Sequence, residues 1–478
     1  MNIRRLFQAI RGQYRFSAGG LTFKEKLALA LPGPASTIGS VIIHNALMKF
    51  YIDIIGIDPV YTGWIYFIYN IWNAINDPLL GVFVDRFKFR PKRGKYVYLM
   101  RVTAPIMIIS TFAMLFSSPS WDDWVIFLVL LLELFIFDTA YTIYSVSYQS
   151  YFLVAAPTKE ERIDVEVIRS YIGNALGFLG TIVPTLLLVG NGNRALVIPV
   201  MSAVIGVNAI MYFIALRGLK EKLSMYSELP VAQPTKGQIL QVWKDSFIIL
   251  KSKEFLTYLL YNVTARGAMG YYFTPFLFFM DHVIRSSGVQ ATLADVIPGI
   301  FVLIILPVIG SYIKKFGSKA IVITSYIPAF IGFSSLLFIT TPLQAIFSYL
   351  FIYLSLYMSG TAAVSINGAL IDDNEQKTGV RKTGLYNGLF ALFATTITSV
   401  QSIIFTNIIS YYGYDGAAAI QSESAVLGIR IGAGVVPLLL GIIGFIPLLL
   451  FPINKKREQQ LSEFNAALRR NDEDKHIK

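Results

Sequence analysis

The chain alternates between long apolar blocks and short charged segments. A bilayer core of about 30 Å requires about 20 apolar residues in a helix, and blocks of that length recur from one end of the chain to the other. This pattern is typical of membrane-spanning helices. Twelve segments are predicted to cross a membrane: 28–52, 60–84, 96–117, 124–152, 166–189, 195–216, 255–281, 291–313, 320–340, 343–371, 384–410 and 424–452.

The composition supports a membrane protein and argues against an enzyme. Hydrophobic residues make up 55% of the 478 positions and charged residues only 15%, whereas soluble domains carry about 25% charged residues. Cysteine is absent and the three histidines lie far apart in sequence, so we expect no disulfide, no metal site and no cofactor. The sequence contains no Walker lysine motif and no Ser-His-Asp set, so it gives no support to ATP-driven transport or to hydrolytic catalysis by this chain.

The positive charges predict the orientation. Cytoplasmic loops of membrane proteins are enriched in Lys and Arg. With both termini placed in the cytoplasm, 34 of the 41 Lys and Arg residues fall in inside segments and two in outside loops. The net charge of +12 therefore follows the topology and does not indicate nucleic-acid binding. We expect a multi-pass protein of the plasma or inner membrane, surrounded by lipid.

The longest polar stretch, 217–253, divides the chain into two halves. A short repeat supports this division: the predicted second helix ends Gly81-Val-Phe-Val-Asp-Arg-Phe87, and the predicted eighth ends Gly310-Ser-Tyr-Ile-Lys-Lys-Phe316. Two six-helix halves form the all-α major facilitator arrangement. The predicted parts are a cytoplasmic tail 1–27, a bundle 28–216, a cytoplasmic loop 217–253, a bundle 254–452 and a cytoplasmic tail 453–478.

The predicted second helix carries a polar group at membrane depth. Asn73 and Asp77 are four residues apart and share a helix face, with Asn76 beside them. Carboxylate and amide oxygens are hard ligands that suit Na⁺, and a carboxylate can also carry a proton. The alternative is a structural aspartate paired with a nearby arginine such as Arg101.

A polar stripe follows the predicted fourth helix. Asp138, Thr142, Ser145 and Gln149 step by four, three and four residues and therefore lie on one face. Such a stripe can line a water-filled path, or it can serve only hydrogen bonds between helices.

Basic residues within the predicted spans add further candidates. Arg169 can hold a substrate or form a salt bridge, and Arg266 is its counterpart in the second half. Charges at this depth are costly and usually mark a cavity or a partner. Lys49, near the end of the first span, can snorkel to the interface.

Two motifs resemble a known family. One is Asn73-Ala-Ile-Asn-Asp-Pro-Leu-Leu-Gly81, followed by Asp85-Arg86 and Arg93-Gly-Lys95; the other is Asp372-Asp-Asn-Glu-Gln-Lys-Thr-Gly-Val-Arg381. Together they are similar to the glycoside–pentoside–hexuronide cation symporters, the melibiose-permease type of major facilitator protein. The linker and the helix count fit this family along nearly the whole chain.

The resemblance implies a cation site on the second and fourth helices. The matching positions are Asn73, Asn76, Asp77 and Thr142. The family has an acid at the first of these positions, and this chain has Asn73. One carboxylate in place of two makes the site less negative, which favours H⁺ or no coupling over Na⁺.

The family's sugar site matches less well. Of its charged residues only the arginine is retained, as Arg169; the helix-four acid falls at Ser145 and the neighbouring Trp at Gln149. Asp138, on the same face as Ser145, can supply the missing acid. The predicted substrate residues are Arg169, Asp138, Ser145, Gln149, Tyr148 and Arg266.

The expected function is symport of a sugar or glycoside with H⁺ or Na⁺ by alternating access, in a protein that acts as a monomer. Its rivals are a transporter of an amphiphilic or lipid-like solute and a membrane sensor that transports nothing. Loops 85–95 and 372–384 are expected to form a cytoplasmic gate. The predicted gate residues are Asp85, Arg86, Arg93, Asp372, Glu375 and Arg381.

Overall fold

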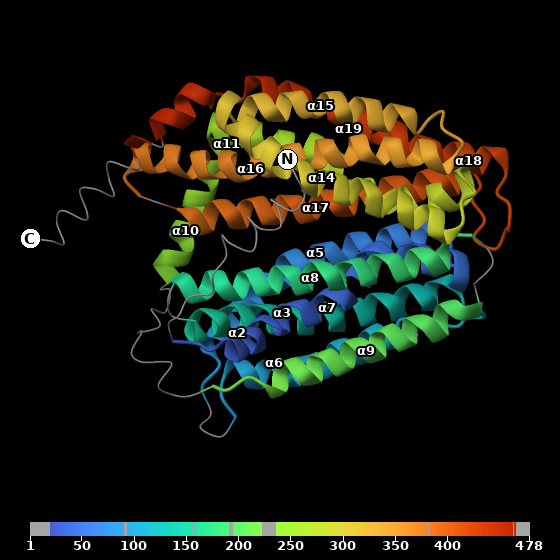
Figure 1. Ribbon diagram of the computed structural model, residues 1–478, viewed down its shortest axis with the longest axis horizontal. Coiled ribbons are helices and arrows are strands. Elements are labelled where there is room, and N and C mark those ends of the chain that lie inside the picture. The colour runs from blue at the N-terminus through green and yellow to red at the C-terminus, as the bar shows by residue number, and fades with distance from the viewer. Residues whose placement is uncertain are drawn as a thin grey trace, which may run out of the picture. The chain divides into compact units, whose positions relative to one another are not determined.

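The fold is known from a computed structural model, which describes residues 20–89, 93–156, 159–190, 195–221, 236–380, 382–461 and 463–464. These ranges form helices joined by turns and contain no β-strand (Figure 1). Each of the twelve predicted spans overlaps a helix or a run of helices. Within the described ranges, eight helical segments are long and apolar enough to cross a membrane: Phe23–Asn45, Tyr96–Ala113, Asp123–Ala155, Glu161–Leu188, Val197–Arg217, Gly288–Phe316, Pro342–Thr378 and Glu423–Leu450.

The chain forms two compact units, each described here by itself. Unit 1 consists of residues 1–48, 75–184 and 195–231. Helix α3 packs on α6, α7 and α9, and α6 also packs on α7 and α9. The helices of unit 1 are α2 (Phe23–Ala30), α3 (Pro32–Asn45), the second part of α5 (Pro59–Arg86), α6 (Tyr96–Ala113), α7 (Asp123–Ala155), α8 (Lys159–Leu188) except its last turn, and α9 (Val197–Arg217).

Hydrogen bonds from side chains to backbone carbonyls connect the helices of unit 1. The Asn208 amide on α9 donates to the Ala35 carbonyl at 2.7 Å, and the Tyr144 hydroxyl on α7 donates to the Pro32 carbonyl at 2.9 Å. A buried polar side chain is stable only when it is hydrogen-bonded. These bonds therefore position α7 and α9 against the start of α3.

The first described helix begins within the predicted tail. Thr22 caps α2 in a reciprocal capping box with Glu25, which satisfies backbone N–H groups that the helix leaves free. Residues 1–19 of the predicted tail lie outside the described ranges.

Unit 2 consists of residues 49–74, 185–194 and 232–478. Helix α16 packs on α14 and α15, and α19 packs on α11 and η4. Its elements are the last part of α4 (Leu47–Phe50), η1 (Tyr51–Ile55), the first part of α5, α10 (Lys236–Lys251), α11 (Lys253–Tyr261), η4 (Asn262–Arg266), α12 (Gly267–Gly270), α13 (Phe273–Phe278), η5 (Phe279–Val283), α14 (Gly288–Phe316), α15 (Ser318–Ser335), α16 (Pro342–Thr378), α17 (Thr383–Tyr411), α18 (Glu423–Arg430), η6 (Ile431–Val435) and α19 (Val436–Leu450).

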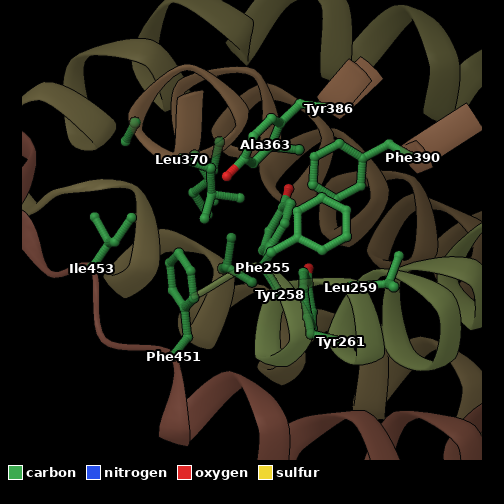
Figure 2. Close-up of a cluster of buried hydrophobic side chains, with 14 of the residues drawn as sticks. Phe255, Tyr258, Leu259, Tyr261, Ala363, Leu370, Tyr386, Phe390, Phe451 and Ile453 are labelled. Carbon is green, nitrogen blue, oxygen red and sulfur yellow. The ribbon is translucent and has the colours of Figure 1, made fainter. Parts of the chain in front are cut away.

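Aromatic side chains dominate one core of unit 2. Figure 2 shows Phe255 and Tyr258 of α11 against Tyr386 and Phe390 of α17, with Phe451 alongside. The Phe255 ring centroid lies 4.8 Å from that of Phe390 and 5.3 Å from that of Tyr386. Such pairs add about 0.5–1.5 kcal/mol each beyond burial, so this core holds α11 firmly to α17.

The predicted span 255–281 is not a regular helix. It consists of α11, η4, α12, α13 and η5, with π-helical turns at Asn262–Arg266 and Phe279–Val283. A π-helical turn inserts an extra residue into a helix and often occurs at functional sites. Two such turns in one span bring Arg266 and His282 into positions that a straight helix would not give them.

The repeated sequence motif lies at two helix ends, as predicted. Helix α5 ends at Arg86 and α14 ends at Phe316. Unit 2 also contains residues 49–74 and 185–194, which belong to the first predicted half.

Candidate functional site

Two adjacent polar pairs join α5 to α7 in unit 1. The Thr142 hydroxyl donates to Asp77 Oδ1 at 2.7 Å, and the Asn76 amide donates to Asp138 Oδ2 at 2.6 Å. Asn76 and Asp77 are neighbours on α5, and Asp138 and Thr142 are one turn apart on α7. The structure therefore brings four of the predicted residues together.

This site is buried on one side and open on the other. Asn76, Asp138 and Thr142 are each at most 4% exposed, whereas Asp77 is exposed. Asn76 Oδ1 is buried and has no hydrogen-bond partner among the described residues. A buried polar oxygen without a partner is costly. The arrangement therefore combines two carboxylates with an amide oxygen that can accept a further bond.

The alternative pairing of Asp77 with Arg101 is not observed. The Arg101 guanidinium donates instead to the carbonyls of Leu216 at 3.0 Å and Leu219 at 3.4 Å. Asn73 lies one turn before Asp77 on α5, in the part of that helix that packs with unit 2.

The predicted stripe along α7 changes from buried to exposed. Asp138 and Thr142 are buried, Ser145 is half-buried and Gln149 is exposed. The Gln149 amide donates to the Ser145 hydroxyl at 3.3 Å. The stripe can therefore lead from solvent to the paired carboxylates.

Arg169 forms a compact group in unit 1. Its guanidinium bonds Glu166 at 2.6 Å and lies 6.0 Å from the ring centroid of Tyr148. Tyr148 is buried and donates its hydroxyl to the Leu29 carbonyl at 3.1 Å. A Cβ at Gly33 would lie 3.0 Å from both Arg169 and Tyr148, so this glycine leaves the space they fill. The salt bridge is about one-third to one-half exposed and adds little stability.

Arg266, in unit 2, is bonded more sparsely. It donates to Asn262 Oδ1 at 3.1 Å within η4, and its buried Nε has no hydrogen-bond partner among the described residues. The Gln401 amide nitrogen is also buried without a described partner. It lies 3.1 Å from a Cβ built at Gly267, the residue after Arg266. Both N–H groups are therefore buried without an acceptor among the described residues of unit 2.

The predicted gate residues occupy helix ends. Asp85 and Arg86 end α5, and Arg93 lies over the Tyr98 ring at 5.7 Å from its centroid. Asp372 and Glu375 lie in the last turns of α16. Arg381 lies outside the described residues.

The acidic end of α16 has partners within unit 2. Asp373 accepts from Arg457 at 2.5 Å and bonds Lys377 at 2.6 Å. Arg457 thereby connects the segment after α19 to α16. This contact was not predicted from the sequence.

Lys49, which the sequence allowed to reach the membrane interface, is instead buried within unit 2. It is 1% exposed and bonds Asp53 and Asp281. The sequence reasoning did not single out these two acids. Asp295 on α14 was also missed, although it is an acidic residue inside an apolar span; it accepts a hydrogen bond from the Tyr353 hydroxyl on α16.

The sequence matches one protein-family model over residues 28–455, nearly the whole chain. That family is described as MFS/sugar transport protein. The chain belongs to this family. It is therefore a multi-pass membrane transporter and not an enzyme.

Several transporters are similar to the chain along most of their length. A putative sulfoquinovose importer of Salmonella typhimurium is 26% identical, with 86% of this chain and 85% of that protein aligned. A putative glycoside/cation symporter of Escherichia coli is 21% identical, with 92% and 94% aligned. The crystal structure of a D-xylose-proton symporter matches at 15% identity with a TM-score of 0.60, covering 90% of this chain and 97% of that one. The similarity to these transporters thus extends over most of the chain, and the solved structure shares its fold.

Proposed function

We propose that this transporter imports an acidic sugar together with a cation that binds between α5 and α7. The relatives named above are importers and symporters, which supports the direction and the coupling. The pairing of Asp77 and Asp138 through Thr142 and Asn76 is the observation that carries the cation site.

The second carboxylate of this site comes from α7. Asn73 stands where the resembling family has an acid. Asp138 of α7 accepts a hydrogen bond from the Asn76 amide, and Asn76 is the neighbour of Asp77 on α5. Two carboxylates with a hydroxyl and an amide oxygen form a hard, negatively charged ligand set. Asp138 therefore restores the negative charge that Asn73 removes, and Na⁺ becomes as suitable a ligand as H⁺.

The charge of the substrate follows from Arg266. A guanidinium inside a membrane span is costly unless it meets an anion or another partner, and Arg binds carboxylates and similar anions through paired N–H groups. Arg266 Nε and the Gln401 amide both have N–H groups free for a ligand within the described part of the chain. We assign them to the anionic group of the sugar.

The remaining features follow the family. We place both termini and the basic segments in the cytoplasm. The transport cycle is alternating access, and a monomer is sufficient for this cycle. Asp85, Arg86, Arg93, Asp372, Glu375 and Arg381 are proposed to close the cytoplasmic side.

One observation favours a second candidate, transport of an amphiphilic solute. Unit 2 has an apolar groove of about 300 Å³ between α12, α15 and α19. Tyr326, Phe330 and Phe333 are among its lining residues. A lipid tail would fit such a groove, either as cargo or as part of the surrounding bilayer.

Uptake into proteoliposomes tests the proposal. Labelled glucuronate, glucose and a lysolipid are offered with an inward Na⁺ gradient, an inward H⁺ gradient or none. We expect glucuronate to accumulate with one gradient, and Asp77→Asn to abolish accumulation while exchange of glucuronate at equal concentrations persists. Arg266→Gln is expected to weaken glucuronate uptake by at least about tenfold, as for loss of one charged hydrogen bond.

Two matched controls separate these roles. Asp58→Asn changes an exposed acid just before α5, and Arg217→Gln changes an exposed arginine at the end of α9; both are expected to transport normally. Glucose uptake unaffected by Arg266→Gln would refute the acidic substrate and leave the cation site standing. Flux of the lysolipid alone would replace the proposal with the second candidate.

A further inference from the structure

A groove of about 780 Å³ runs between α6 and α9 in unit 1, apart from the α5–α7 site. The two helices pack side by side (Figure 1). The lining is apolar along most of the groove, where Ile109 and Phe213 are 68% and 64% exposed. Arg101 and Arg217 line one end. The volume is within the range of ligand sites, about 300–1,000 Å³. This feature is called the α6–α9 groove below.

Small side chains leave room for the groove. Ala104 of α6 and Ala209 of α9 both line it, and neither has a side-chain atom beyond Cβ. Larger apolar side chains surround them, among them Ile108 and Tyr212. Atoms that line a gap lose the packing contacts of a filled interior, and a lipid tail in the bilayer can restore those contacts. The groove is therefore suited to an acyl chain.

One of the two arginines is held in place by the backbone. Arg101 lies near the start of α6, and its Nη2 donates to the carbonyls of Leu216 at 3.0 Å and Leu219 at 3.4 Å. A guanidinium has five N–H donors on three nitrogens. The bonds within the described residues use one of these nitrogens, so Nη1 and Nε retain donors for an anion.

The second arginine is positioned by the end of α9. Arg217 is the last residue of this helix, and its guanidinium lies 5.7 Å from the centroid of the Phe213 ring. Four residues later, Glu221 accepts hydrogen bonds from the Tyr96 and Val97 N–H groups at 3.0 and 2.9 Å. These bonds hold the segment after α9 to the start of α6, and they fix both arginines at the same end of the groove.

The two arginines have no acidic partner in the described part of the chain. Neither forms a salt bridge there, and no carboxylate lines the groove. Glu221 is bonded instead to backbone N–H groups of α6. Two like charges beside an apolar groove in a membrane are costly unless an anion meets them, and guanidinium groups bind phosphate through paired N–H groups. The groove therefore combines a phosphate site with an apolar channel.

The predicted topology gives the depth of the arginines in the membrane. Arg101 follows the basic loop 85–95, and Arg217 begins the polar stretch 217–253; we place both segments in the cytoplasm. The arginines then lie at the level of the headgroups of the cytoplasmic leaflet. Basic pockets between membrane helices on this side bind anionic lipid headgroups.

Unit 2 provides a comparison that separates the charge from the packing. Its apolar groove involves α15 and α19, the third and sixth predicted spans of the second half, as α6 and α9 are of the first. Lys319 donates to the carbonyls of Leu449 at 2.9 Å and Phe451 at 2.6 Å, which repeats the bonds that Arg101 makes to the end of α9. No charged side chain is among the described residues that line this second groove. The paired arginines are thus particular to unit 1.

We infer that the α6–α9 groove binds one anionic glycerophospholipid of the cytoplasmic leaflet, with its phosphate between Arg101 and Arg217 and an acyl chain along the groove. A soluble anion would leave the apolar lining unused. A zwitterionic lipid would bring a cation for which the described lining offers no carboxylate. The choice of leaflet rests on the proposed orientation; the sugar and the coupling cation play no part in the inference.

A fluorescent probe beside the groove tests the lipid site. The natural chain has no cysteine, so Ile210→Cys can be labelled at a single position with a bimane fluorophore. Ile210 is 60% exposed and follows Ala209 of the lining. It lies seven residues before Arg217, which at 1.5 Å per residue is about 10 Å deeper in the membrane. Bromine atoms in the middle of an acyl chain would therefore quench it.

The labelled full-length protein is placed in phosphatidylcholine vesicles that contain a minor fraction of brominated lipid. Quenching by brominated phosphatidylglycerol is compared with quenching by phosphatidylcholine carrying the same brominated chains. We expect a preference for phosphatidylglycerol of at least about fivefold in relative binding constant, equivalent to about 1 kcal/mol, as for one basic residue at an anionic surface. The preference is expected to fall as salt is added.

Two variants and a second probe serve as controls. Arg217→Gln, which is expected to transport normally, should lose most of the preference, whereas Arg217→Lys should keep most of it because the charge remains. The second probe, Ile443→Cys, is 56% exposed and follows Ile442 of the apolar groove in unit 2. We expect it to show no preference between the two lipids.

Equal quenching of the Ile210→Cys probe by the two lipids would overturn the inference. An equal preference at both probes would overturn it as well, because it would reflect a general attraction of anionic lipid to a basic protein. Should Arg217→Gln not fold, Arg101→Gln takes its place, and a preference that it leaves unchanged would exclude a phosphate between the arginines. The readout is fluorescence, so this site and the proposed transport are tested separately.

Discussion

At the residue scale, the site depends on which side chains of α7 face α5. The sequence predicted the pairing of Thr142 with Asp77 because the two positions match one family site. It did not predict that Asp138 would bond Asn76, since helical periodicity identifies a face of α7 but not the residues opposite it. Asp138 was consequently assigned to the substrate and is now proposed for the cation.

Thr142 offers a graded test of the cation site. Thr142→Val removes the hydroxyl that donates to Asp77 and keeps the shape. Hydrogen bonds to charged groups contribute about 1.5–3 kcal/mol, so the cation concentration for half-maximal uptake is expected to change about 10- to 100-fold. Thr142→Ser, which keeps the hydroxyl, should transport nearly normally. Identical uptake curves for the Val variant and the natural protein would exclude Thr142 from the site.

At the element scale, a buried ion pair connects α2 to α8. Lys26 and Asp164 lie 2.5 Å apart, and their side chains are 1% and 5% exposed. The predicted spans begin at residues 28 and 166, so the sequence placed Lys26 and Asp164 in the charged segments just before them, whereas both belong to helices. It did not predict the ion pair, because the two residues are 138 positions apart and each resembles an ordinary charge near a helix end.

Breaking this ion pair should destabilise unit 1. Lys26→Met leaves a buried carboxylate without its cation, which costs about 3–5 kcal/mol. We expect a lower midpoint of thermal unfolding in detergent. The double variant Lys26→Met with Asp164→Leu should recover most of the loss, because no charge is then buried. A single variant as stable as the natural protein would show that the pair is not important for the fold.

At the scale of the whole molecule, the orientation remains to be measured. The absence of cysteine makes single-cysteine labelling unambiguous. Lys456 lies in the predicted cytoplasmic tail, and Ile420, which is 71% exposed, lies in the predicted outer turn. An impermeant maleimide should label Ile420→Cys in intact cells and Lys456→Cys only after permeabilisation. The reverse pattern would contradict cytoplasmic termini.

The sequence predicted the all-helical membrane fold and the family but not the grouping of segments into units. Residues 49–74 belong to the first half by sequence and pack with unit 2. Their grouping depends on contacts such as Lys49–Asp281, which join distant parts of the chain. Hydrophobic periodicity reports only on neighbouring residues, so it cannot show these contacts.

This packing has a consequence for how the protein is made. A ribosome adds about 5–20 residues per second, so Lys49 emerges roughly ten to fifty seconds before Asp281. During that interval Lys49 lacks its partners Asp281 and His282. Asp53, however, lies one turn from Lys49 and bonds it within the same helical run, so each can neutralise the other as soon as that turn forms. The order of synthesis thus makes Asp53 the early partner of Lys49 and leaves Asp281 to complete the assembly at a late stage of biogenesis.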